Sequence, residues 1–147
     1  MQKRCFYLIA ASAGACLLFG SNLGFGQPKG ITLEATVVSG VNSTLATHWA
    51  TDRRSCQPQH LVVGITAPPA NGTVVTEHKS IIIPASGTLG GPQACAGKPA
   101  EAVVIYYQSR PGFTGEDSFR YQRTNLDNAQ DALNVEISYT VKVKLPN

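Results

Sequence analysis

Residues 133–144 read LNVEISYTVKVK, and this stretch decides the fold class because apolar and polar side chains alternate along all of it. Its apolar members are Leu133, Val135, Ile137, Tyr139, Val141 and Val143. Successive side chains of a β-strand point to opposite faces, so a period of two is typical of a long strand with one buried face. The stretch therefore predicts a strand at the C-terminal end of the domain.

The other end of the domain carries a similar alternation. Residues 31–37 read ITLEATV, and Ser39-Gly40 ends the run. This pattern predicts a first strand, for which the C-terminal strand is the expected partner. Each of the two, the first taken as residues 29–38, is also a candidate edge strand for pairing with a partner's strand.

Shorter runs between these ends, rich in β-branched and aromatic residues, predict further strands. They span residues 45–50, 61–66, 73–77, 80–83, 103–108 and 118–123. Turn-forming clusters separate them, and no segment has the apolar spacing of a helix. About seven or eight short strands without helices predict an all-β fold, an antiparallel immunoglobulin-like β-sandwich.

The first 26 residues have the pattern of a secretory signal peptide. Lys3 and Arg4 precede an apolar run over residues 5–19, and small residues lie before Gln27. The run is shorter than the roughly 20 residues that a helix needs to cross a bilayer. We therefore expect residues 1–26 to be a cleaved signal peptide and residues 27–147 to form one domain, with no transmembrane segment after cleavage.

A second interpretation of the leader concerns residues 13–16, which read AGAC and resemble the lipobox of bacterial lipoproteins. In such proteins the cysteine is lipidated and becomes the new N-terminus, so Cys16 would carry a lipid anchor. Ala13 stands where these boxes usually have Leu, and cleavage before Gln27 is the preferred interpretation. The expected location is the periplasm or the extracellular space.

Charge excludes one class of partner. The leader takes Lys3 and Arg4 with it, which leaves 10 basic and 9 acidic residues. A domain this close to neutrality has no charge excess to attract nucleic acid or an anionic membrane.

Cysteine usage predicts one disulfide. Of four cysteines, Cys5 and Cys16 lie in the leader, and Cys56 and Cys95 remain in a chain bound for an oxidising compartment. We expect these two to form a disulfide, with a reactive or metal-binding pair as the alternative. Closing a loop of about 40 residues stabilises a fold by about 4 kcal/mol in the chain-entropy model.

Residues 104–121 read VIYYQSRPGFTGEDSFRY. This stretch resembles the Y-x-P-x-x-G-F-x-G-x-D-x-F-x-Y signature of the Ig-like and cadherin-like repeats of bacterial surface proteins. Residues 68–74, PPANGTV, resemble the P-x-N-G-T-V hairpin of the same repeats. The resemblance covers about residues 31–145 and implies a sandwich. The residues of its structural corner are Gly112, Phe113, Gly115, Asp117, Phe119 and Tyr121.

This corner motif has a physical logic. Gly112 and Gly115 permit a tight bend with positive φ. Asp117 is placed to accept backbone N–H groups at the bend. Phe119 and Tyr121, two residues apart on a strand, share one face.

Motifs for chemistry are lacking, because the sequence contains no nucleophile elbow, zinc-protease or phosphate-loop pattern. We therefore expect no enzymatic activity and no cofactor. Two residue sets offer metal ligands, and in both we expect ordinary surface or hydrogen-bonded side chains instead of a metal site. The sets are His48, His60 and His78 for Zn²⁺ or Cu²⁺, and Glu116, Asp117, Asp127 and Asp131 for Ca²⁺.

Arginine and aromatic side chains are the candidate residues for recognition of a ligand. Arg53 and Arg54, beside Asp52, form a candidate anion-binding patch, for instance for a polyanionic glycan. Exposed aromatic side chains often anchor protein or carbohydrate recognition. The aromatic candidates are Trp49, Tyr106, Tyr107 and Tyr139. Adjacent tyrosines on a strand point to opposite faces, so one of Tyr106 and Tyr107 is expected in the core.

These observations favour an exported, non-enzymatic Ig-like domain of the bacterial envelope or extracellular space, with a structural role or one in recognising a protein or glycan. The loops around Cys56 and Cys95 are the expected recognition surface. The alternative is a periplasmic inhibitor or accessory protein of a secreted enzyme, whose loop at residues 85–102 plugs a cleft. A third hypothesis is a metal-binding envelope protein.

Overall fold

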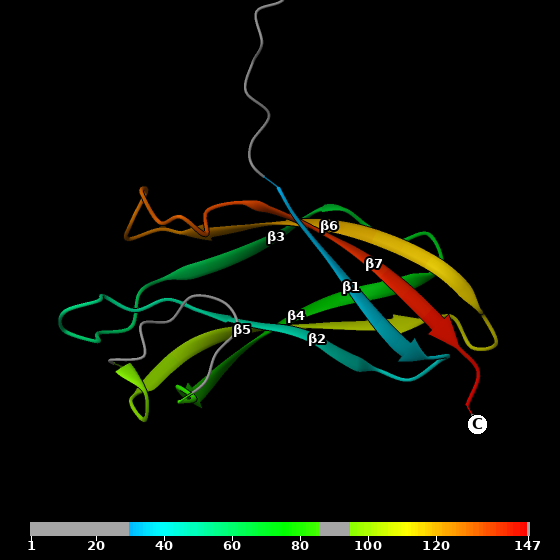
Figure 1. Cartoon of the computed structure of the whole chain (residues 1–147), viewed down its shortest axis with the longest axis horizontal. Coiled ribbons are helices and arrows are strands. Elements are labelled where there is room, and N and C mark those ends of the chain that lie inside the picture. Colours follow the sequence, from blue (N-terminus) through cyan, green and yellow to red (C-terminus); the bar gives the residue numbers. More distant parts are fainter. Residues whose placement is uncertain (1–29, 86–94, 147) are drawn as a thin grey trace, which may run out of the picture.

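The computed structural model describes residues 30–85 and 95–146, which form seven β-strands without an α-helix (Figure 1). The strands are β1 (Ile31–Val38), β2 (Ser43–Trp49), β3 (Leu61–Ala67), β4 (Gly72–Ile82), β5 (Pro99–Ser109), β6 (Gly115–Asn125) and β7 (Glu136–Lys144). The predicted all-β fold is confirmed. None of these residues belongs to a helix long and apolar enough to span a membrane. The signal peptide expected at residues 1–26, and Cys16 within it, lie outside the described residues.

Two sheets form the layers of the β-sandwich (Figure 1). The strand order is β1-β7-β6-β3 in the four-stranded sheet and β2-β5-β4 in the three-stranded sheet. The first strand pairs with the last, as predicted, but the pair is parallel, with Ile31 opposite Ile137 and Val38 opposite Lys144. The other four strand pairs are antiparallel, so the predicted antiparallel β-sandwich is confirmed apart from this one pair. The period of two shows which face of a strand is buried, but it does not show whether the neighbouring strand runs parallel or antiparallel.

Two further predictions about strands are corrected. The C-terminal strand is no edge, because β7 lies between β1 and β6. The runs expected at residues 73–77 and 80–83 are one continuous strand, β4. The polar residues that separated them in the sequence lie exposed on β4, which is an edge strand. An edge strand accommodates a polar interruption that a buried central strand would not.

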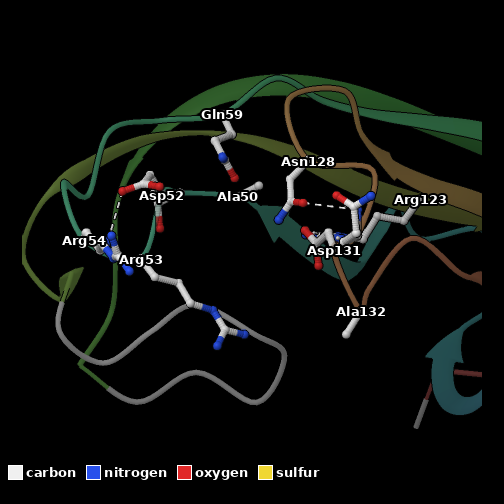
Figure 2. A pocket seen from close by; sticks show the side chains of 11 residues that line it. Ala50, Asp52, Arg53, Arg54, Gln59, Arg123, Asn128, Asp131 and Ala132 are labelled. Carbon is white, nitrogen blue, oxygen red and sulfur yellow. Dashed lines mark hydrogen bonds and ion pairs between the residues drawn. The ribbon is translucent and has the colours of Figure 1, made fainter.

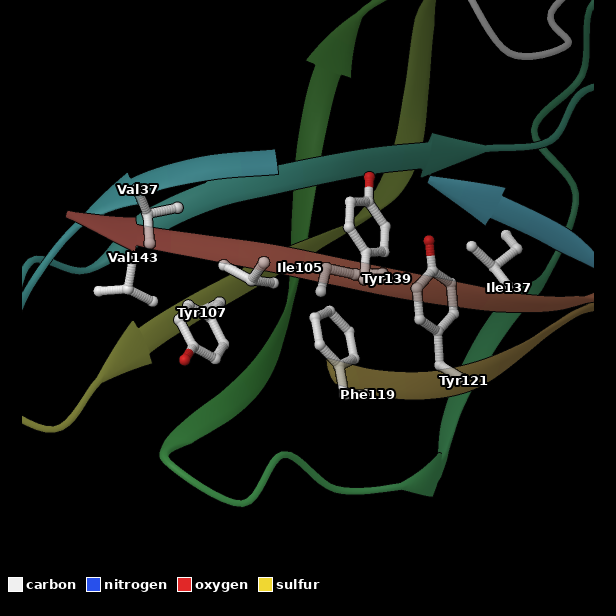
Figure 3. Close-up of a cluster of buried hydrophobic side chains, with 9 residues drawn as sticks. Val37, Ile105, Tyr107, Phe119, Tyr121, Ile137, Tyr139 and Val143 are labelled. Carbon is white, nitrogen blue, oxygen red and sulfur yellow. The ribbon is translucent and has the colours of Figure 1, made fainter. Parts of the chain in front are cut away.

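The main core lies between the sheets (Figure 3). Its buried members are Val37, Ile105, Tyr107, Phe119, Tyr121, Ile137, Tyr139, Val141 and Val143. The Phe119 and Tyr139 rings stack with centroids 5.3 Å apart, and Tyr107 and Tyr121 lie beside Phe119 at 6.2 and 6.1 Å. Stacked aromatic pairs contribute beyond their buried area, so these four rings are the centre of the packing.

The predicted corner has the expected geometry. Gly112 and Gly115 have positive φ, at 79° and 118°. The buried Asp117 carboxylate accepts the N–H groups of Ala70 and Asn71 at 3.0 and 2.9 Å, and the hydroxyl of Tyr107 at 2.9 Å. One carboxylate thus fastens the turn before β4 and the core strand β5 to the start of β6.

Candidate functional site

A disulfide joins Cys56 and Cys95, as predicted, with their Cα atoms 5.4 Å apart. It links the loop after β2 to the segment before β5, and it packs in a small second core with Trp49, Ile83, Ala100 and Ala102. Trp49 is only 7% exposed. The prediction that Trp49 belongs to a recognition surface is therefore corrected. Its indole packs with the bridge and the alanines of β5 and presents little surface to a partner.

The loop at residues 51–58 is shaped by its own hydrogen bonds. The Asp52 carboxylate accepts the N–H groups of Ser55 and Arg54 at 2.8 and 3.0 Å, and the Ser55 hydroxyl at 2.9 Å. The hydrogen bonds from Ser55, followed by the one from Arg54, lower the pKa of Asp52 below its ordinary value. A bridge between Thr51 and Pro58 closes the loop. Arg53 and Arg54 are consequently presented to solvent from a loop of defined shape.

The facing loop follows β6 and is held by a buried arginine. Arg123 is 2% exposed, and its guanidinium donates to Asp131 Oδ2 at 3.4 Å and to the carbonyl of Trp49 at 3.3 Å. Asp131 also accepts Asn125 Nδ2 at 3.0 Å and the N–H of Leu133 at 2.9 Å. Burial raises the pKa of Asp131, but these hydrogen bonds and the charge of Arg123 outweigh it, so the net shift is downward.

A polar pocket of about 510 Å³ lies between these two loops (Figure 2). Asp52, Arg53 and Arg54 stand on one side, and Asn128 and Asp131 on the other. Its remaining polar lining comes from Thr51, Gln59, Arg123 and Gln130. Three arginines and two aspartates therefore contribute to one pocket of a size usual for small-molecule sites.

Two buried polar atoms of residues that line this pocket have no hydrogen-bond partner among the described residues. A guanidinium has five N–H donors, and charge-assisted bonds are ordinarily 2.7–2.9 Å long. Arg123 makes its two bonds at 3.3 and 3.4 Å, and its Nε has no partner among the described residues. The buried Thr51 hydroxyl likewise has none there. Buried polar groups are nearly always paired, so these two atoms are exceptions in the packing, and neither has accessible surface that a ligand in the pocket could reach.

The candidate metal ligands are spread over the molecule. His48 is buried and bonded to Tyr121, whereas the exposed His60 pairs with Asp127 at 2.9 Å. His78 lies on β4. Within residues 30–85 and 95–146 no group of three or more histidine, cysteine or acidic side chains is placed to hold a metal ion.

The acidic residues proposed for Ca²⁺ are likewise separated. Asp117 serves the corner, Asp127 faces His60, and Asp131 faces Arg123. Glu116 is exposed on β6, opposite Lys142 on β7. Each carboxylate therefore lies in its own environment, and the structure does not bring the four together.

Of the candidate aromatics, Tyr107 and Tyr139 are buried in the main core. Tyr106 points to the other face of β5, as expected for its neighbour in sequence, and stays half-buried. The Lys79 amine donates to its hydroxyl at 2.7 Å and lies 5.3 Å from its ring centroid. Tyr106 is thus the one residue of this set that is accessible, at a different place from the polar pocket.

Sequence reasoning located Arg53 and Arg54 but missed Arg123. The signal was present, because Arg123 follows Phe119 and Tyr121 at the same two-residue spacing and so falls on the buried face of β6. A charged residue in phase with core residues is an anomaly that marks a paired or functional group.

A second pocket, which is mainly apolar, was also missed. It has a volume of about 330 Å³ and lies between β3 and the β4–β5 pair. Leu61, Val62, Val103 and Leu126 supply its apolar lining. No motif in the sequence indicates it, because its lining comes from strands of different sheets that are far apart in the sequence.

Comparison with known proteins finds no matching family model, no matching curated protein and no matching solved structure. What the chain does is therefore inferred from its residues and their arrangement.

Proposed function

We propose that this chain is an exported, non-enzymatic Ig-like binding domain of the bacterial envelope or extracellular space, and that its ligand binds in the polar pocket. The secretory pattern of residues 1–26 and the disulfide between Cys56 and Cys95 support export to an oxidising compartment. The corner motif at residues 104–121 supports the Ig-like assignment. A rigid sandwich that presents shaped loops is a usual architecture for recognition.

The observation that carries the proposal is the set of arginines at the pocket. Arg53, Arg54 and Arg123 line it together, and both aspartates beside them are already engaged. Asp52 is hydrogen-bonded within its own loop, and Asp131 accepts bonds from Asn125 and Leu133. Arg123 is buried and paired with Asp131, so Arg53 and Arg54 are the exposed guanidinium groups that an acidic group on a ligand would meet. Guanidinium groups bind carboxylates through two parallel N–H···O bonds.

The rest of the lining favours a glycan as the bearer of that acidic group. Gln59, Asn128 and Gln130 offer amides, each of which donates and accepts hydrogen bonds. A sugar ring carries hydroxyl groups around its edge, and each can donate to or accept from such an amide. The proposed ligand is accordingly a glycan that contains uronic acid.

Both walls of the pocket are fixed before a ligand arrives. Asp52 and the disulfide hold one loop, and Arg123 with Asp131 holds the other. Binding to a preformed site avoids the entropy cost of ordering loops.

Calorimetric titration of the full chain, purified from a bacterial periplasm, with an oligouronate and a neutral oligosaccharide of equal length tests this proposal. We expect the oligouronate to bind, and the double variant Arg53→Gln/Arg54→Gln to weaken it by a factor of about ten or more, as expected for losing charged hydrogen bonds. Arg110→Gln is the matched control, since Arg110 is an exposed arginine outside this pocket. Equal binding of both sugars, or equal loss in the control, contradicts the proposal.

The inhibitor hypothesis places the active segment at residues 85–102. Its middle part, residues 86–94, lies outside the described residues. The described end of the segment is tied back to the fold, because Gly97 donates to Ile83 O at 2.8 Å and Ile83 donates to Lys98 O at 2.9 Å. No observation on the described residues favours this hypothesis or the metal-binding one, and neither is advanced as a second function.

A further inference from the structure

β4 is an edge strand, and one of its sides has no partner strand among residues 30–85 and 95–146. It spans eleven residues, against seven or eight for the other edge strands β1, β2 and β3. One side pairs with β5 along its whole length, and no described strand lies along the other side. A long edge with unpaired backbone groups is a template for another strand.

The register with β5 shows which backbone groups are unpaired. Just beyond the two ends of β4, Ile83 donates its N–H to the carbonyl of Lys98, and the carbonyl of Asn71 accepts the N–H of Arg110. In this register the odd-numbered residues of β4 direct their backbone N–H and C=O groups toward β5. In an antiparallel ladder the intervening residues point their N–H and C=O groups the other way. The outward groups of β4 therefore belong to its even-numbered residues, including Val74, Thr76, His78, Ser80 and Ile82.

The sequence of this strand is self-complementary. Residues 74–82 read VVTEHKSII, and His78 is their centre. Moving outward from His78, each step meets a matched pair: Glu77 with Lys79, Thr76 with Ser80, Val75 with Ile81, and Val74 with Ile82. An antiparallel pairing of two copies about His78 places the members of each pair opposite one another.

Charge selects this register over its neighbours. Centring the pairing on Glu77 or on Lys79 would put two like charges opposite each other, which is destabilising. Centring it on Thr76 or on Ser80 would place a charge opposite Val75 or Ile81. Only the His78 register, among these five, puts Glu77 opposite Lys79 twice. It also uses the outward backbone groups of the even-numbered residues in hydrogen-bonded pairs, and the charged residues fall in the closer, non-hydrogen-bonded pairs.

The side chains concerned are accessible. The Glu77 and Lys79 side chains are 53% and 43% exposed, and within one chain they pair at 3.1 Å. Val75 and Ile82 are among the exposed large hydrophobic residues. Charges on an edge strand ordinarily discourage indiscriminate pairing, whereas here they match a second copy in one register. We propose that two copies of this chain associate through β4 in antiparallel register about His78, making one continuous six-stranded sheet from two three-stranded sheets.

Sedimentation equilibrium of the full chain, purified from a bacterial periplasm, tests the proposal through charge reversal. The wild type should sediment as a dimer, and Glu77→Lys and Lys79→Glu should each weaken association by about tenfold or more, because both cross-strand pairs become repulsive. The double variant E77K/K79E should regain the dimer. An equimolar mixture of the two single variants should form a heterodimer, since every cross-strand charge pair is then opposite in sign.

The matched control is Glu116→Lys, which makes the same charge change at an exposed position of the other sheet. It should leave the dimer unchanged. Thermal unfolding of each variant shows that its fold is retained. A monomeric wild type, a dimer that E77K leaves intact, or single variants that do not associate when mixed would each overturn the proposal. None of these outcomes bears on the polar pocket, which does not include β4.

Discussion

The Nε2 atom of His48 lies 2.7 Å from the hydroxyl oxygen of Tyr121, and this hydrogen bond joins the two sheets across the interior. His48 is on β2 of the three-stranded sheet, and Tyr121 is on β6 of the four-stranded one. Both side chains are buried. Burial, followed by the positive charge of Arg123, lowers the pKa of His48 to about 4. The imidazole is therefore neutral in the folded protein at neutral pH.

This pair predicts a loss of stability in mild acid. In the unfolded chain His48 titrates near its ordinary pKa of 6.5. Between pH 6.5 and pH 4 the unfolded state therefore binds a proton at His48 that the folded state does not bind. The stabilisation is complete above pH 6.5 and is lost as the pH falls toward 4. We expect the free energy of unfolding to drop by about 2 kcal/mol between pH 7.5 and pH 5. Urea unfolding at the two pH values measures it.

The control for this effect is His48→Gln, which keeps a hydrogen-bonding side chain but cannot titrate. Its free energy of unfolding should change much less between pH 7.5 and pH 5 than that of the wild type. Equal pH dependence of the two proteins would rule out His48 as the source.

Asp117 predicts a coupled pair of substitutions at the corner. Asp117→Ala removes the acceptor of the Ala70 and Asn71 N–H groups and of the Tyr107 hydroxyl, and we expect a loss of about 3 kcal/mol. In the Asp117→Ala background the Tyr107 hydroxyl has lost its acceptor. Tyr107→Phe should therefore lower the free energy of unfolding less in that background than in the wild type. A double-mutant cycle by chemical unfolding measures the coupling. Strictly additive costs would argue against the direct bond.

Two glycines on edge strands make a matched pair. A Cβ at Gly72 would lie 2.7 Å from the carbonyl oxygen of Gln108 and from a ring carbon of Tyr107, whereas a Cβ at Gly64 would meet nothing within 4 Å. Gly72→Ala should therefore destabilise by about 1–3 kcal/mol through overpacking. Gly64→Ala should be neutral or stabilising by up to about 1 kcal/mol. Thermal unfolding midpoints decide the matter, and a Gly64→Ala loss as large as that of Gly72→Ala would contradict the packing.

Removing the disulfide should cost about 4 kcal/mol in the chain-entropy model, since Cys56 and Cys95 are 39 positions apart in the sequence. The double variant Cys56→Ala/Cys95→Ala, compared with the wild type by urea unfolding, measures this. The oligouronate should also bind it more weakly, because the loop that carries Arg53 loses its anchor. Unchanged affinity would show that the loop is held by Asp52 alone.

Most of the strands could be predicted because alternation records burial directly. β1 and β7 follow from period two, and the disulfide follows from the only two cysteines outside residues 1–26. The parallel direction of β1 against β7 could not be predicted, because a strand buries the same face whichever way its neighbour runs. The unbroken course of β4 could not be predicted either, because polar residues 78 and 79 interrupt its pattern and an edge strand accommodates them.

The site was predicted in part. Arg53 and Arg54 were expected at a recognition surface and do line the pocket. The prediction that Trp49 lies on a recognition surface was wrong. Its indole packs on Ala100 and Ala102, which come from a strand about fifty residues further along the chain. Arg123 pairs with Asp131 from a loop, a contact that no spacing rule indicates. Local patterns thus identified the strands, and the pocket arises from contacts between loops that only the fold brings together.

The measurement that tests the central claim most directly is nuclear magnetic resonance mapping of the oligouronate on the full chain purified from a bacterial periplasm. The account predicts that the backbone amides of residues 51–54 and 128–132 shift as the sugar is added, and that a neutral oligosaccharide leaves them unchanged. Shifts confined to another place, such as the turn at Arg110 and Gly112, or no shifts at any concentration of the oligouronate, would contradict it.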